Sequence, residues 1–196
     1  MKSTRTYSMD SRAAGAAATR ERIARSAQTL FLEQAYEDVT LAAIAKASGV
    51  SHQTVLNHFE SKEGVVLAVA ELLKAERTAA RYDATPGDVP GAVRALVADY
   101  EQMGDANVRW ATSERLEILA DLMEEARRSH QGWIVAMFGD QLPTAPATRR
   151  RAVHALHAAT DAYTWKLLRR DLRQSRTETE KTIADLVVGI LEGHHR

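Results

Sequence analysis

The chain of 196 residues contains no cysteine, which excludes disulfide bonds, thiolate metal sites and cysteine nucleophiles. No apolar run approaches the roughly 20 residues that a membrane-spanning helix requires, and the N-terminal segment lacks the apolar stretch of a signal peptide. Glycine-rich phosphate loops and the G-x-S-x-G pattern of hydrolases are also missing. We therefore expect a cytoplasmic protein with no membrane association and no catalytic site.

Proline is scarce, with four residues, and no segment shows the alternation of β-branched and polar residues that is typical of strands. Residues that favour helices, such as alanine, leucine, glutamate and arginine, are abundant. The predicted fold class is therefore all-α. Basic and acidic residues balance at 26 each, so the net charge gives no indication of nucleic-acid binding. The charge is uneven, however, because residues 1–25 hold six basic side chains against two acidic ones.

Two short predicted helices joined by a tight turn organise the most informative stretch of the chain. They are expected over about residues 41–47 and 52–59. Thr40 and Ser51 stand where a side-chain oxygen caps the start of each helix. Gly49 stands between them, where a positive φ angle costs little. This spacing is that of a helix-turn-helix.

The outer face of the second predicted helix carries neutral hydrogen-bonding side chains, because Val55 faces the core. These side chains are His52, Gln53, Thr54 and Asn57. A short exposed helix with such groups suits base edges in the major groove of DNA. The spacing alone also fits an ordinary helical hairpin with a polar outer face.

Three sequence patterns in this stretch resemble the N-terminal domain of the TetR family of transcriptional regulators. They are Val39-Thr40, A-x-x-S-G-V-S from Ala45 to Ser51, and H-F-x-S-K-E from His58 to Glu63. The resemblance extends from a predicted helix at about residues 19–34 to about Leu73. It implies an N-terminal three-helix helix-turn-helix DNA-binding domain and a C-terminal helical ligand-binding and dimerisation domain.

The resemblance and the local composition together predict four parts of the chain. We expect a flexible basic arm at 1–17, the helix-turn-helix domain at 18–64, a connecting helix at 65–82, and an effector-binding and dimerisation domain at 83–196. The arm either adds contacts to DNA phosphates or is a solvated tail. Arg20 is expected near the free N–H groups at the start of a helix, where a phosphate binds favourably.

The family pattern implies the DNA contacts residue by residue. Thr40 resembles a capping residue that also touches a backbone phosphate, and Lys62 resembles a common phosphate contact. Leu56 stands where the family most often has tyrosine, so it either makes an apolar contact with DNA or turns towards the core. The predicted DNA-binding residues are Thr40, Ser51, His52, Gln53, Thr54, Leu56, Asn57, His58 and Lys62.

The last part of the chain is expected to be helical throughout. The predicted helices cover about 89–103, then 107–138 with a break near Ser113 or Gly132, then 148–170, and finally a helix that starts at a capping box over 177–180. Two apolar stripes on the last two helices predict a homodimer built as a four-helix bundle, unless they are buried within one chain. The stripes are Val153, Leu156, Thr160, Tyr163 and Leu167, and Ile183, Leu186, Val187, Ile190 and Leu191.

All three tryptophans lie in residues 83–196, with several methionines and tyrosines. Such residues favour a pocket for a lipophilic or aromatic small molecule, although at helical spacing they more often form plain core. The candidate pocket residues are Tyr100, Met103, Trp110, Trp133 and Met137. No cofactor is expected, and no metal site either, because His154 and His157 lack a third convergent ligand.

The function predicted from these observations is a dimeric repressor that binds a double-stranded DNA operator and is released by a small-molecule effector. One alternative is an all-α ligand-binding or enzymatic protein whose helix-turn-helix is only structural. The other is an architectural protein that binds DNA without sequence preference, which the neutral net charge disfavours.

Overall fold

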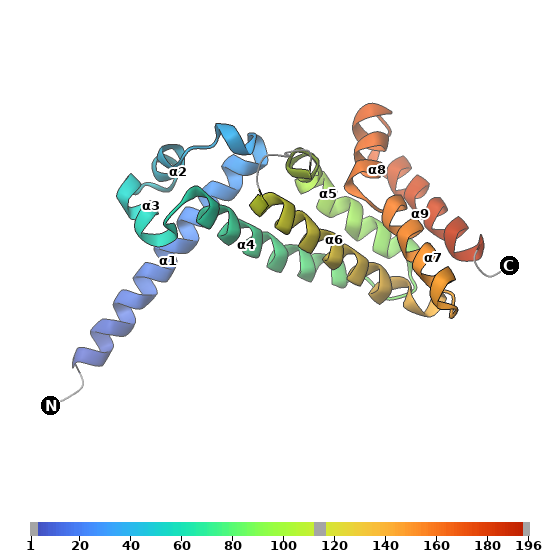
Figure 1. The fold of residues 1–196 in the computed structure, drawn as a ribbon, viewed down its shortest axis with the longest axis horizontal. Coiled ribbons are helices and arrows are strands. Elements are labelled where there is room, and N and C mark those ends of the chain that lie inside the picture. Colours follow the sequence, from blue (N-terminus) through green and yellow to red (C-terminus); the bar gives the residue numbers. More distant parts are fainter. Residues whose placement is uncertain (1–3, 112–116, 194–196) are drawn as a thin grey trace. The chain divides into compact units, whose positions relative to one another are not determined.

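A computed structural model describes residues 4–111 and 117–193, and every regular element within these ranges is helical (Figure 1). The predicted fold class is therefore confirmed. The chain divides into two compact units, Met1–Lys74 and Ala75–Arg196. The division falls within helix α4, Lys62–Tyr82, and the finer domain boundaries given above stay a prediction. None of the helices in the described ranges combines the length and apolar character that a bilayer crossing requires.

The first unit begins with α1, Thr4–Glu33, and continues through three short elements into α4. These are the 3-10 turn η1, Tyr36–Asp38, and helices α2, Leu41–Ser48, and α3, His52–Phe59. Helix α2 packs against both α1 and α3, which buries apolar side chains and stabilises helices too short to persist alone. The buried core consists of Ile23, Ala24, Ala27, Phe31, Tyr36, Val39, Ile44, Ala45, Val55, Phe59, Val65, Val66, Val69 and Leu73.

Helix α1 begins at Thr4, whereas we expected a flexible arm over 1–17 and a helix from Thr19. The run from Ala13 to Ala18 contains five alanines, the residue with the highest helix propensity, and only Gly15 interrupts it. Arg20 consequently lies inside a helix, where backbone N–H groups bond to carbonyls four residues earlier. The expectation of free N–H groups beside Arg20 is therefore wrong.

The second unit packs its helices around one contiguous apolar core. Its elements are α5, Val89–Ala111, α6, Glu117–Phe138, η2, Gly139–Gln141, α7, Pro146–Ala159, α8, Ala162–Lys166, the π-helical turn η3, Leu167–Asp171, and α9, Arg176–Gly193. Helix α5 contacts α6, α8 and α9. Gly104 permits the contact with α8, because a Cβ atom there would lie 2.3 Å from the ring of the fully buried Trp165.

The expected helix over 148–170 is interrupted at Thr160, which ends α7. The Thr160 hydroxyl donates to the Leu156 carbonyl at 2.6 Å, and Asp161 caps α8 by accepting from the Tyr163 N–H at 2.9 Å. A residue that caps a new helix ends the previous one, so this dipeptide separates α7 from α8. Helix α9 likewise begins earlier than expected, because the hydroxyl of Ser175 caps it by accepting from the Glu178 N–H.

One break was expected in the helical sequence over 107–138, near either Ser113 or Gly132. It does not lie at Gly132, since α6 continues through that residue. The alternative position, Ser113, lies outside the described residues.

Candidate nucleic-acid interface

The turn between α2 and α3 is built from local side-chain caps and one left-handed residue. Thr40 Oγ1 accepts from the Ala43 N–H at 3.1 Å, and Ser51 Oγ accepts from the Thr54 N–H at 3.0 Å. Gly49 has a φ of 67°, in the region that favours glycine, and ends α2. Both predicted caps and the predicted glycine turn are confirmed.

Helix α3 presents neutral polar groups to solvent on the face opposite its buried Val55 and Phe59. The side chains of His52, Gln53 and Asn57 are exposed. Gln53 Nε2 donates to Asn57 Oδ1 at 2.9 Å, which ties the two amides together one turn apart. Each amide keeps further donor or acceptor capacity, so the pair offers both kinds of group to a base edge.

The remaining predicted contacts on α3 are less exposed. Thr54 is half-buried, and its hydroxyl lies 2.8 Å from that of Ser51. Leu56 and His58 are also half-buried, and the His58 ring lies 6.3 Å from the Phe59 ring, between centroids. The structure therefore brings the predicted surface together around the exposed amides, with Leu56 at its edge rather than in the core.

The ammonium of Lys62 is engaged within the first unit. Its Nζ donates to the backbone carbonyl of Tyr36 and lies 3.9 Å above the centre of the Tyr36 ring. The Tyr36 hydroxyl in turn donates to Glu63 Oε1 at 3.0 Å. Burial, together with that hydrogen bond, raises the pKa of Tyr36 to about 12, and burial lowers the pKa of Lys62. Lys62, the predicted phosphate contact, thus binds Tyr36 within the first unit.

Two arginines of α1 reach the C-terminal ends of the next two helices. Arg20 Nη1 donates to the His58 carbonyl at 2.6 Å, and Arg22 Nε donates to the Ser48 carbonyl at 3.2 Å. The Arg20 guanidinium also lies 4.3 Å from the centre of the Phe59 ring. Sequence reasoning missed these roles because no local pattern identifies a partner 26 or 38 residues away.

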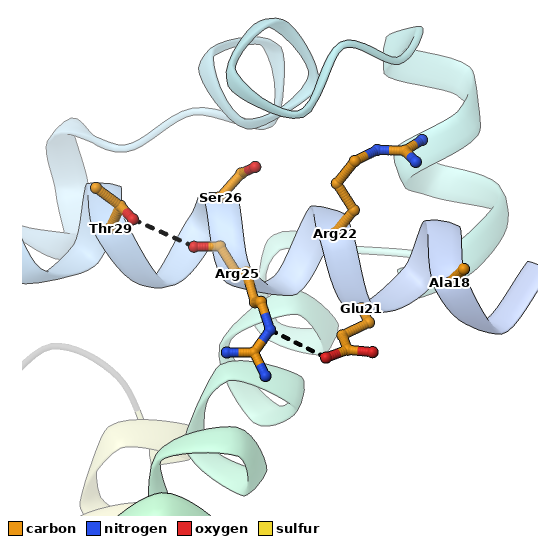
Figure 2. A pocket seen from close by; sticks show the side chains of 6 residues that line it. All are labelled: Ala18, Glu21, Arg22, Arg25, Ser26 and Thr29. Carbon is orange, nitrogen blue, oxygen red and sulfur yellow. Dashed lines mark hydrogen bonds and ion pairs between the residues drawn. The ribbon is translucent and has the colours of Figure 1, made fainter.

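A hollow of about 460 Å³ lies along α1 (Figure 2). Its lining residues are Ala18, Glu21, Arg22, Arg25, Ser26 and Thr29. Arg25 pairs with Glu21 at 3.0 Å on the same helix, and Figure 2 shows the Arg22 side chain pointing away from that pair. An open hollow whose two arginines already bond to Glu21 and to the Ser48 carbonyl is a poor site for a small molecule.

The five candidate pocket residues of the second unit are all buried: Tyr100, Met103, Trp110, Trp133 and Met137. Three of them, Tyr100, Trp133 and Met137, belong to the contiguous core. The Tyr100 hydroxyl donates to the Thr160 carbonyl at 3.0 Å, and the Trp133 indole N–H donates to the Arg81 carbonyl at 3.3 Å. Two of the candidates therefore anchor backbone as well as fill the interior.

Beside these residues lies a buried polar chain that sequence reasoning did not identify. Arg81 pairs with Asp99, with 2.8 Å between Nε and Oδ2, and Arg81 Nη1 lies 3.3 Å from His130 Nδ1. His130 Nε2 lies 2.9 Å from Thr160 Oγ1. The Thr160 proton goes to the Leu156 carbonyl, so Thr160 accepts from His130 Nε2, and His130 Nδ1 accepts from Arg81.

The capped helix pair with an exposed polar face defines a helix-turn-helix domain, a class of fold that reads DNA. Residues 23–69 match the family model of bacterial regulatory proteins, tetR family. Residues 23–69 therefore form an N-terminal domain of the TetR family of transcriptional regulators, as the sequence patterns predicted. Regulators of this family bind DNA and are not enzymes, which agrees with the predicted absence of catalysis.

Sequence similarity to individual regulators covers only part of this chain. The transcriptional regulator TcmR of Streptomyces glaucescens is 35% identical over 123 residues, which cover 58% of this chain and 54% of TcmR. UidR of Escherichia coli (strain K12) is 35% identical over 74 residues, 38% of this chain and 37% of UidR. The chain thus spans about half or less of these curated relatives.

A crystal structure of a tetR-family regulator from Streptomyces coelicolor superposes with a TM-score of 0.75 at 16% identity. The superposition covers 90% of this chain and 81% of the Streptomyces coelicolor chain. At this level of identity the likeness concerns the fold.

Proposed function

We propose that the chain is a homodimeric repressor that binds a near-palindromic DNA operator and is released by a lipophilic or aromatic small molecule. The observation that carries the proposal is the exposed amide pair Gln53 and Asn57 on a helix capped by Ser51. Glutamine and asparagine pair bidentately with adenine in the major groove, and the Thr54 methyl group suits a thymine methyl. Thr40, at the start of α2, is proposed to contact a backbone phosphate.

Dimerisation is proposed because one short recognition helix reads too few base pairs for useful specificity. The two predicted stripes separate into a buried and an exposed set. Leu156, Ile183, Val187 and Leu191 lie in the core of one chain. Tyr163, Leu167 and Leu186 of the stripes are large exposed apolar side chains on α8, η3 and α9, and Val188 of α9, outside the stripes, is exposed as well. Exposed apolar surface gathered on neighbouring elements favours burial against a second copy.

Release by an effector requires a molecule that binds better to a conformation unsuited to DNA. The support for an apolar effector is the concentration of aromatic and methionine side chains within one unit, including Met103 and Trp110. A tenfold change in DNA affinity corresponds to about 1.4 kcal/mol of coupling between the two ligands.

The direct test replaces both Gln53 and Asn57 with alanine and measures binding to an operator found by selection. We expect at least a hundredfold loss of affinity, since each bidentate contact is worth about 1–3 kcal/mol. Gln34→Ala is the matched control, because Gln34 is an exposed glutamine of the same unit outside α3. Unchanged operator affinity in the double variant would refute the proposed reading surface.

A further inference from the structure

Both helices of the helix-turn-helix are held at their C-terminal ends by side chains of α1. The His58 carbonyl belongs to the last turn of α3, and Arg20 donates to it at 2.6 Å. The Ser48 carbonyl is that of the last residue of α2, and Arg22 donates to it at 3.2 Å. The two arginines are two residues apart on α1, so this helix contacts both α2 and α3.

These contacts complete the capping of helices that are only eight residues long. The last carbonyls of a helix have no partner within it and carry partial negative charge, which a guanidinium satisfies. The N-terminal ends are already capped by Thr40 and Ser51. Isolated helices of two turns are unstable in water, so the caps determine where α3 begins, ends and points.

The C-terminal end of α3 has a second fixed neighbour. A Cβ atom on Gly64 would lie 2.1 Å from the Phe59 carbonyl oxygen, so the start of α4 approaches that carbonyl as closely as a glycine permits. The Arg20 guanidinium lies over the ring of the same Phe59, at 4.3 Å from its centre. Arg20 therefore contacts both the His58 carbonyl and the Phe59 ring at the end of α3 that meets α4.

We propose that Arg20 is a positioning residue for the recognition helix, which acts on DNA affinity through α3 and makes no contact with phosphate itself. Arg22 has the corresponding role for α2. The inference rests on the proposed DNA-binding function. The charge of Arg20 and its place in the chain would otherwise suggest that it contacts a phosphate.

The first test needs no DNA and compares hydrogen–deuterium exchange of backbone amides in the full chain. In Arg20→Met we expect exchange in α3 to accelerate roughly fivefold or more, with α2 unchanged. Arg22→Met should instead accelerate exchange in the last turn of α2. Arg20→Lys keeps a charged donor for the His58 carbonyl and should restore most of the protection. Arg25→Met is the charge-matched control, because Arg25 pairs with Glu21 on α1 itself.

The second test measures operator affinity against salt concentration. Loss of a phosphate contact would reduce the slope of log affinity against log salt by about 0.9 and weaken all sequences equally. For Arg20→Met we expect about tenfold weaker operator binding with an unchanged slope and a reduced preference for the operator over random DNA.

A reduced slope, or α3 exchange equal to that of the wild type, would overturn the inference. If the wild-type protein bound no DNA sequence specifically, the proposed function would fail. The exchange comparison would then decide the role of Arg20 alone.

Discussion

Three cations of the first unit end on backbone carbonyls of the same unit. Arg20, Arg22 and Lys62 donate to the carbonyls of His58, Ser48 and Tyr36. Each joins segments that are at least 26 residues apart in sequence, so their charge stabilises the domain. We therefore expect attraction to phosphate to come largely from other groups, for example from Lys2, Arg5 and Arg12 in the first 17 residues of the sequence.

For single residues, hydrogen bonds to nearby backbone groups could be predicted from the sequence, and hydrogen bonds to residues distant in the chain could not. Thr40, Gly49 and Ser51 act on backbone groups within about four residues, so the sequence contains the whole interaction. Arg20 and Lys62 act on groups brought near only by folding. A basic residue in a DNA-binding domain then suggests a phosphate contact even where the structure gives it an internal carbonyl.

The burial of Tyr36 and its hydrogen bond to Glu63 predict a loss of stability at alkaline pH. The pKa of Tyr36 is about 12 in the folded state because of burial and its hydrogen bond to Glu63, against about 10 for an unfolded tyrosine. The neutral phenol therefore stabilises the fold fully below pH 10, and this contribution, at most about 3 kcal/mol, is lost between pH 10 and 12. Urea unfolding at pH 9 and 11.5 measures it.

Tyr36→Phe should remove most of that alkaline loss. Tyr163→Phe is the control, because Tyr163 is an exposed tyrosine of the second unit. Equal alkaline losses in the wild type and in Tyr36→Phe would contradict the assignment.

Between elements, glycines set how closely the helices approach. Gly64 lies against the Phe59 carbonyl where α3 meets α4, and Gly104 lies against the Trp165 ring where α5 meets α8. The same scale shows which boundaries the sequence could predict. Helix α3 was placed correctly by its caps. The interruption at Thr160 was missed because apolar spacing over 148–170 fits one helix, and it becomes evident only from the bonds of Thr160 and Asp161.

Substitution of Gly64 by alanine is expected to destabilise the first unit by about 1–3 kcal/mol, because the new methyl group would displace backbone at Phe59. Gly15→Ala makes the same chemical change inside α1, where nothing lies within 4 Å, and should stabilise the helix by up to about 1 kcal/mol. Thermal unfolding followed by circular dichroism gives both shifts. Shifts of the same sign would show that the approach of α4 to Phe59 is not limiting.

For the whole molecule, we propose a DNA-reading first unit and a second unit whose exposed apolar side chains form a dimer surface. The sequence predicted the helix-turn-helix because its caps and turn are local landmarks, and the dimer interface stays a prediction. The sequence could not separate the two sets of apolar residues on α9. Ile183 and Leu186 are three residues apart, yet one is fully buried in the monomer and the other is 44% exposed.

A charge placed on the exposed set should dissociate the dimer. We expect Leu167→Glu combined with Leu186→Glu to give a monomer in sedimentation velocity, because an unpaired carboxylate is costly to bury in an interface. Operator affinity should fall at least tenfold, since paired half-sites are then read separately. Leu67→Glu is the control, a comparably exposed leucine of the first unit. A double variant that remained dimeric would place the interface elsewhere.

Selection of bound sequences from a random duplex pool, with purified protein at about physiological salt, measures directly whether α3 reads base edges. We predict enrichment of a near-palindrome whose half-sites are spaced for two recognition helices of one dimer. We also predict that Gln53→Ala with Asn57→Ala abolishes that enrichment. Binding without any enriched sequence, with a steep salt dependence alone, would contradict the claim that α3 reads base edges.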